Sequence, residues 1–409
     1  MKKNVYLFVT LFTIISFSCS SDNSNNDNPV EPDPVFDCNY HGNVVLTTQA
    51  EVNSFASFGY CRIIDGHLII GNSTSESNIG SLSGLSTITK LNGNVIIINN
   101  PLLTTLQGLH NITDASYIEI KNNNSLINLT GFGSVVNFSG NSTGFHLISN
   151  ASLQNLEGLE NMQNIPTIQI DNCPSFNSLH GLENCTSLQN LEITSCPLLT
   201  NLVPLANLEQ LGTLKMWDNE SFTSLQGLNN VTEMDQLELK NNQALVSLDG
   251  LDNLTVLVGL SCIQNHSLTT LGGLEHITKI HNINITSNNG LISLSGLQNV
   301  TETADLKINY NNALTSIAHL SSLIKIDAYF SGLSYIGGLD INLNPSLLSL
   351  NGLQNITLFR GDLYVTNNNS LTGLCAILNS IQTGTIQYMY VYNNANPVTS
   401  SLLNLGNCN

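Results

Sequence analysis

Apolar side chains recur along this chain in two local patterns that follow one another. One is an alternation with polar residues, as at Ile118 and Ile120. The other is a run of apolar residues three apart, such as Leu103, Leu106 and Leu109. Alternation is typical of a short strand with one buried face. The run with a spacing of three is too tightly turned, and too often interrupted by glycine, for a stable helix. The two patterns therefore predict a short strand followed by a compact, non-helical return.

Both patterns repeat about every 23 residues, and one position of the repeat holds only asparagine or cysteine. An asparagine that points inward where the chain leaves a strand can bond the backbone groups that the sheet no longer pairs. Because an unpaired buried amide costs about 1–3 kcal/mol, a repeated asparagine implies a repeated partner. Cysteine fits as a small, buried, weakly polar substitute. This predicted ladder consists of Asn100, Asn123, Asn150, Cys173, Cys196, Asn219, Asn242, Asn265, Asn288, Asn311, Asn344 and Asn368.

Two further columns run through the same repeat. Glycine stands eight residues after the ladder position in most repeats, as at Gly108 and Gly250, which indicates positive φ or backbone too close for a Cβ. A second asparagine column follows three residues later, with Ser134, His276 and Ser322 as exceptions. Its members are Asn111, Asn161, Asn184, Asn207, Asn230, Asn253, Asn299, Asn355 and Asn379. Both columns predict structural roles.

Stacked copies of such a repeat form a solenoid, because neighbouring coils bury the apolar columns that one coil cannot bury alone. Equivalent strands then pair in parallel about 4.8 Å apart. The pattern L-x-I-x-N-N-x-x-L-x-x-L-x-G-L, carried by residues 95–109 with Val95 at its first position, resembles the receptor L-domain branch of the leucine-rich-repeat superfamily over residues 43–396. The resemblance implies a mainly β fold, a right-handed leucine-rich-repeat-like β-solenoid of about 12–13 coils. It also implies a recognition module, and no catalytic residue belongs to the motif.

The N-terminal residues predict export and anchoring. Lys2 and Lys3 precede an apolar run that ends at Cys19, and small residues before a lone cysteine resemble a lipoprotein signal. A plain signal peptide with an incidental cysteine is the alternative. The expected divisions are a signal peptide over 1–19, a disordered tether over 20–37, an N-terminal cap with irregular coils over 38–92, the repeat solenoid over 93–374 and a C-terminal cap over 375–409. We expect lipid anchoring of the protein to a bacterial outer membrane, exposed on the cell surface.

The other eight cysteines fall into two groups. Cys38 and Cys61 precede the first regular coil, and Cys375 and Cys408 flank the last. A disulfide at each end would close the open core of a solenoid in an oxidising compartment, so we expect Cys38–Cys61 and Cys375–Cys408 bridges. The remaining four are expected to be buried thiols, with a bridge between the two ladder cysteines as the alternative: Cys173, Cys185, Cys196 and Cys262.

The outward strand positions form the one regular face that the repeat leaves for a ligand. In its middle they bring together Trp217, the only tryptophan, with Glu192, Lys215, Glu238 and Lys240 on adjacent coils. A tryptophan flanked by charges is typical of a hot spot for a protein or a sugar. The alternative is that Trp217 covers apolar surface while the charges form a solvated ion ladder that contributes little. These five residues are the predicted binding site.

Composition and motifs argue against other functions. The net charge is −18 with eleven Lys plus Arg, so there is no basic patch for nucleic acid. There is no HExxH, CxxC, G-x-S-x-G or phosphate-cradling glycine loop, so we expect no catalytic residue, metal or cofactor. Glu192 and Glu238 lie two coils apart, about 9–10 Å, near the separation in an inverting glycosidase, but Lys215 lies between them.

The sequence therefore predicts a non-catalytic recognition or adhesion module that binds a protein or glycan outside the cell. Its only membrane contact is expected to be the lipid anchor. Two alternatives stay open: a carbohydrate-binding or carbohydrate-active surface component, such as a glycan accessory protein, lyase or hydrolase, and a passive structural surface protein. A tyrosine group near the C-terminal end is interpreted as covering the last coil; it consists of Tyr364, Tyr388, Tyr390 and Tyr392.

Overall fold

The computed structural model describes residues 38–55, 61–132, 135, 137–138, 144–328 and 337–395. The chain divides after residue 36 into two units, and every described residue lies in the second. Cys19, the tether expected over residues 20–37, and Cys408 therefore fall outside the described residues. In the part of the chain that the structure describes, no helix is both long enough and apolar enough to cross a membrane.

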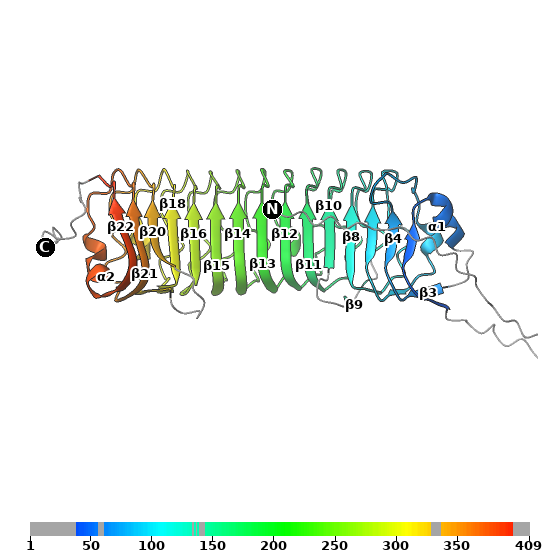
Figure 1. Cartoon of the computed structure of the whole chain (residues 1–409), viewed down its shortest axis with the longest axis horizontal. Helices are drawn as coiled ribbons and strands as arrows, with labels where there is room; N and C mark the ends of the chain where they lie inside the picture. The colour runs from blue at the N-terminus through cyan, green and yellow to red at the C-terminus, as the bar shows by residue number, and fades with distance from the viewer. Residues whose placement is uncertain are drawn as a thin grey trace, which may run out of the picture. The chain divides into compact units, whose positions relative to one another are not determined.

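Fifteen described strands form one parallel sheet, which we call the main sheet. Figure 1 shows them side by side in chain order. The stack has about 14 turns with a period of about 23 residues, which confirms the expected solenoid and slightly exceeds the expected coil number. The strands are β2 (Val44–Leu46), β4 (Leu68–Gly71), β6 (Val95–Ile98), β8 (Tyr117–Lys121), β10 (Gly144–Ile148), β11 (Asn164–Asp171), β12 (Ser187–Thr194), β13 (Gln210–Trp217), β14 (Glu233–Lys240), β15 (Val256–Ile263), β16 (Asn282–Thr286), β18 (Asp305–Asn309), β20 (Gly338–Asn342), β21 (Leu358–Thr366) and β22 (Thr385–Tyr392).

A second parallel sheet, the lateral sheet, precedes the main sheet in each coil. The sequence pattern predicted one strand per repeat and missed it. In the middle of the solenoid one strand serves both sheets, because β11 pairs with β12 through Ile165, omits Pro166 and resumes at Thr167. Elsewhere the lateral sheet has its own strands: β1 (Cys38–Tyr40), β3 (Cys61–Ile64), β5 (Lys90–Leu91), β7 (Asp114–Ala115), β9 (Asn137–Phe138), β17 (Glu302–Thr303) and β19 (Lys325–Asp327).

Each main-sheet strand from β6 to β22 ends in the same turn. The residue before the ladder position has a left-handed backbone, with φ between 54° and 61° from Asn99 to Asn393. The ladder residue then points inward, and all twelve predicted ladder residues are fully buried. In Asn242, Nδ2 donates to the Met216 carbonyl at 2.9 Å and Oδ1 accepts from the Asn219 N–H at 3.2 Å. These two bonds tie each coil to the one before it.

The return after the ladder takes one of two forms. Where glycine occupies its column, φ lies between 103° and 118°, and a Cβ on Gly250 would lie 2.3 Å from the Leu225 carbonyl oxygen. Both properties require glycine, as the column predicted. Where another residue stands there, a short 3₁₀ helix replaces the turn: η2 (Val203–Leu205) at Pro204, η3 (Ala318–Leu320) at His319 and η4 (Cys375–Ile377) at Ala376.

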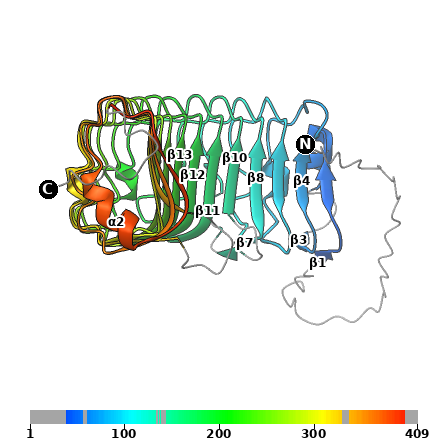
Figure 2. The same cartoon turned by 60° about the vertical axis from the view of Figure 1, so that its left-hand side comes forward.

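One continuous apolar core runs through the stack, built from the inward strand residues and the leucines of the returns. At its N-terminal end, α1 (Gln49–Phe55) contributes Val52 and Phe55 to this core, near η1 (Ser83–Leu85). At the other end, α2 (Leu378–Thr383) contacts β21, as Figure 2 shows beside the last coils. Among the described residues, the two helices therefore lie near the two ends of the stack.

Candidate functional site

The predicted binding residues lie together on the outward side of the main sheet. Strand register places Lys215 of β13 opposite Glu192 of β12 and Glu238 of β14. It also places Trp217 opposite Lys240. Their intervening neighbours point inward and are buried, as the alternating burial along β13 shows. The fixed period of the repeat made this juxtaposition predictable.

Two ammonium groups contact the one indole ring. The Lys215 Nζ lies 3.9 Å from the centroid of the Trp217 ring, and the Lys240 Nζ lies 5.1 Å from it. Both distances are within the range of cation–π attraction, worth about 0.5–1 kcal/mol at exposed sites. Trp217 is half-buried. Its ring is held between charges rather than projecting alone.

The charges around this ring are unequally paired. The Lys215 Nζ lies 3.8 Å from Glu192 Oε2, and the two side chains are 24% and 33% exposed. A half-exposed pair at this distance contributes little to stability. Lys240, by contrast, forms no ion pair within the described ranges; its ammonium contacts the Trp217 ring. The site therefore offers a cation that a ligand acceptor can reach without breaking an existing bridge.

The N-terminal part of the same face carries an aromatic pair. The Tyr117 ring lies 4.5 Å from the His146 ring, and the Tyr117 hydroxyl donates to Glu119 Oε2 at 3.3 Å. Burial lowers the pKa of His146, so the imidazole is neutral at physiological pH. Burial, and then the Glu119 charge, raise the pKa of Tyr117. The Tyr117 hydroxyl and the His146 imidazole therefore add no charge for a ligand, whereas the acidic Glu119 lies beside them.

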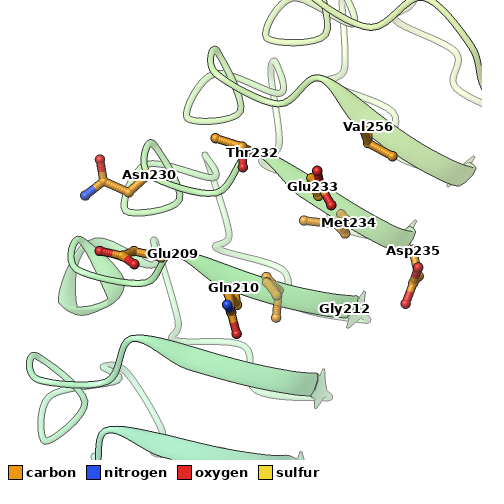
Figure 3. A pocket seen from close by; sticks show the side chains of 10 residues that line it. Glu209, Gln210, Gly212, Asn230, Thr232, Glu233, Met234, Asp235 and Val256 are labelled. Atoms are coloured by element: carbon orange, nitrogen blue, oxygen red, sulfur yellow. The ribbon is translucent and has the colours of Figure 1, made fainter.

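An acidic groove that the sequence did not reveal lies on the lateral sheet (Figure 3). It has a volume of about 760 Å³ and contains no Lys or Arg. An adjoining groove of about 430 Å³ shares Glu209 and Asn230 with it. Both are open and polar. The lining of the first is Glu209, Gln210, Leu211, Gly212, Asn230, Thr232, Glu233, Met234, Asp235 and Val256.

Some acidic side chains of the loops accept hydrogen bonds from the backbone of the glycine turns. The Gly158 N–H donates to Glu160 Oε1, and the Gly273 N–H donates to Glu275 Oε2, each at 2.8 Å. A side-chain acceptor two residues after the column glycine thus satisfies the backbone of the turn. The second asparagine column bonds nearby, since Asn253 Nδ2 donates to the carbonyl of the preceding coil at 2.8 Å. Carboxylates in this register are therefore no sign of catalysis.

The tyrosine group does not cover the last coil, contrary to the interpretation from sequence. Tyr388, Tyr390 and Tyr392 of β22 are 48%, 46% and 47% exposed. The inward residues of that strand, such as Met389 and Val391, pack against the core instead. The ladder continues at Asn394, which lies 26 residues after Asn368. Its Nδ2 donates to the Val365 carbonyl, and its Oδ1 accepts from the Asn368 N–H. This irregular step concealed the register of β22.

The cysteines match the expected division as far as the structure describes them. Cys375 is disulfide-bonded, and β1–β3 register places Cys38 opposite Cys61. The bridges to Cys61 and Cys408 stay predictions. The four remaining cysteines are free and buried: Cys173, Cys185, Cys196 and Cys262. Among the described residues, no group of three or more His, Cys, Asp or Glu side chains could hold a metal ion.

Comparison with known families supports the repeat type. The family model of the Endo-beta-N-acetylglucosaminidase EndoS LRR domain matches residues 132–225. The chain is a leucine-rich-repeat-like solenoid. The crystal structure of the TLR13–ssRNA13 complex is similar over 83% of this chain, at 15% identity and a TM-score of 0.39. The solenoid spans 55% of that chain. No curated protein matches.

Proposed function

We propose that this solenoid is a non-catalytic recognition module that binds a protein or glycan ligand through the outward face of the main sheet. The observation that carries the proposal is the position of its only tryptophan, held between Lys215 and Lys240 in the middle of that face. Tryptophan in such surroundings supplies large contact area and is enriched among hot-spot residues.

Each residue of the site has a distinct role in this proposal. Trp217 provides the apolar contact, and Lys240 provides a positive charge that is free of ion pairs in the described part of the chain. Glu192 and Glu238, on either side of Lys215, set the orientation of a polar ligand. Because strands hold all five side chains in register, little conformational entropy is lost on binding.

The same geometry supports a binding role over a catalytic one. Lys215 stands between Glu192 and Glu238 in register, and its ammonium lies 3.8 Å from Glu192. A glycosidase needs its acid and base carboxylates to face a shared substrate space. Here a lysine occupies that space.

We further propose that the module works outside the cell, anchored to a bacterial outer membrane through Cys19. The motif of basic residues, apolar run and Cys19 supports export and lipidation, and the polar residues 20–37 support a tether. Metabolic labelling with a palmitate analogue in the producing cell tests the anchor. We expect label in the native chain and none in Cys19→Ser; equal labelling of both would contradict lipidation at this residue.

The binding proposal is tested with glycan and cell-surface-protein arrays probed with the chain from Ser20 onward. We expect a saturable hit whose affinity falls at least about tenfold in Trp217→Ala. Lys240→Ala should weaken it as well. Lys121→Ala is the matched control, because Lys121 occupies the same outward column on β8, away from the tryptophan.

Two results would contradict the proposal. Absence of binding on both arrays would favour a passive surface element. Binding that Trp217→Ala leaves unchanged would place recognition elsewhere. Thermal unfolding of each variant shows whether the fold is intact. The half-buried position of Trp217 makes an intact fold the expected outcome.

A further inference from the structure

The outward tyrosines of β22 are exposed in a way that neither the core nor the proposed Trp217 site explains. Tyr388, Tyr390 and Tyr392 alternate with residues that pack inward, so they form a row on one side of a single strand. The row spans four residue steps, about 13 Å. It lies seven coils from β13 in the pairing order, about 34 Å along the stack.

The middle ring of this row is fixed by stacking. Register pairs Tyr390 with Tyr364, and their rings are parallel to within 7° with centroids 5.2 Å apart. One face of Tyr390 is therefore covered by Tyr364. Tyr390 is nevertheless 46% exposed, so its uncovered face and edge are open to solvent. A further coil would place another side chain against that face, and in the described residues no such coil follows β22.

We infer that this tyrosine row is a second binding site, which takes a neutral oligosaccharide with one pyranose ring stacked on the open face of Tyr390. The ring of the sugar continues the stack that Tyr364 and Tyr390 begin. Aliphatic C–H groups of a pyranose suit the negative face of an aromatic ring. The hydroxyls of Tyr388 and Tyr392, on either side, lie where they can bond hydroxyls of neighbouring sugar units.

The charges nearby select a neutral ligand over an acidic one. Asp362 lies beside the row, since its Oδ1 accepts from the Tyr388 N–H at 3.1 Å and the Tyr364 hydroxyl bonds its Oδ2 at 3.4 Å. Asp340 lies opposite Tyr364 in register. Lys307, the cation on this part of the face, is paired with Asp305 at 2.8 Å. A uronate or sialate placed on Tyr390 would meet carboxylates and no free cation in the described neighbourhood.

One exposed amide suited to sugar hydroxyls lies beside the row. Asn393 is exposed directly after β22, and its Nδ2 donates to Asn367 Oδ1 at 3.1 Å. Thr366, opposite Tyr392, is buried, and its hydroxyl already donates to Asn342 Oδ1 at 2.8 Å. Amides and hydroxyls of this kind both donate and accept, as sugar hydroxyls do.

Isothermal titration tests the site with six defined hexasaccharides and the chain from Ser20 onward. Five are neutral oligomers of glucose (β-1,4 and β-1,3), mannose, xylose and N-acetylglucosamine, and the sixth is hexagalacturonate. We expect saturable binding of at least one neutral oligomer. Tyr390→Ala should weaken it about tenfold, and Tyr390→Phe should retain it because the ring remains. Tyr310→Ala is the matched control, since Tyr310 is equally exposed at 48% but lies at a turn away from the row.

The outcomes separate this site from the Trp217 site. Binding that survives in Trp217→Ala but falls in Tyr390→Ala supports the inference whatever becomes of the first proposal. Four results overturn it: no neutral oligomer binds at millimolar concentration, Tyr390→Ala binds as well as the native chain, Tyr390→Phe loses binding, or hexagalacturonate binds most tightly. Tyr388→Ala provides a second variant of the row, and circular dichroism with thermal unfolding verifies the fold of each.

Discussion

At the scale of the residue, the ladder asparagine decides how one coil is joined to the next. Its amide donates to a strand carbonyl of the preceding coil and accepts from the ladder N–H of that coil, as Asn265 does for Leu239 and Asn242. Both partners are buried, so each would otherwise be unsatisfied. Cys173 reproduces part of this arrangement, with its Sγ 3.7 Å from the Leu147 carbonyl. The asparagine column is therefore a hydrogen-bonding requirement.

The first prediction concerns this requirement. Asn242→Ala leaves the Met216 carbonyl and the Asn219 N–H without their side-chain partner in the core. We expect it to lower the free energy of unfolding by about 2–6 kcal/mol in urea titrations. Asn253→Ala, in the exposed column of the same coil, is the control and should lower it by less than about 1 kcal/mol. Equal losses of unfolding free energy in the two variants would show that the buried hydrogen bonds contribute no more than the exposed one.

The residue before the ladder is constrained in a different way, by its left-handed backbone. Asparagine tolerates this conformation better than other non-glycine residues, and it occurs at several of these turns. Leu343 is a misfit there, with φ of 56°. We predict that Leu343→Asn raises the free energy of unfolding by about 0.5–1 kcal/mol.

Leu348→Asn provides the comparison for that substitution. Leu348 is exposed at 58%, whereas Leu343 is half-buried, and Leu348 is not among the positive-φ residues, so its replacement should change stability by less than about 0.5 kcal/mol. Chemical denaturation of both variants measures their free energies of unfolding and so tests the prediction. A loss of stability in Leu343→Asn would show that the packing of the leucine outweighs its backbone strain.

At the scale of the element, the return after each strand is the part with two solutions. A column glycine allows a left-handed turn that passes close to the preceding coil, and its replacement by Pro204 or His319 is accompanied by a 3₁₀ helix. The leucines on either side remain buried in both forms. The core therefore tolerates either turn, provided that the residue in the glycine column suits that turn.

A third prediction follows for these turns. Gly250→Ala would place a Cβ 2.3 Å from the Leu225 carbonyl oxygen, at a φ of 111°, so we expect a loss of more than about 2 kcal/mol in unfolding free energy. Gly272→Ala is the control, because its nearest heavy atom would be 3.6 Å away. It should change stability by no more than about 1 kcal/mol. A loss in Gly250→Ala as small as that in Gly272→Ala would mean that the coil converts to the 3₁₀ form at little cost.

At the scale of the whole molecule, stability should depend on alkaline pH through the buried thiols. Burial raises the pKa of Cys173 and Cys185 to about 11 and of Cys196 and Cys262 to about 12, from 9.0. Above pH 9 the unfolded chain releases these protons and the folded chain retains them. Their contribution is therefore complete below pH 9 and is lost as pH rises towards 11–12.

The fourth prediction is that the free energy of unfolding falls between pH 9 and pH 10.5, by up to about 1.4 kcal/mol per pH unit for each thiol. Cys262→Val should reduce this slope by the contribution of one thiol. Valine fits the position, because aliphatic residues occupy it in other coils. Urea unfolding at pH 7.5, 9.0, 10.0 and 10.5 measures both slopes. Identical slopes in the native chain and the variant would refute a shifted pKa for Cys262.

The candidate Trp217 site was foreseeable from the sequence to the extent that the period held. Glu192, Lys215 and Glu238 are one repeat apart, so their order on the face followed directly. The packing of two ammonium groups on one ring did not, because it depends on side-chain rotamers. The β22 tyrosines were misplaced for another reason: the 26-residue step to Asn394 hid the ladder position that fixes which side they face.

The sequence by itself determined the period, the parallel stacking, the buried ladder and the glycine turns. Each arises from contacts between equivalent positions of successive coils, so one repeated pattern records them all. Only the tertiary structure decided the lateral sheet, the acidic groove around Glu233 and the outward row centred on Tyr390. These depend on where the chain bends within a coil and on the coil that terminates the stack. Neither is repeated often enough along the chain to form a pattern.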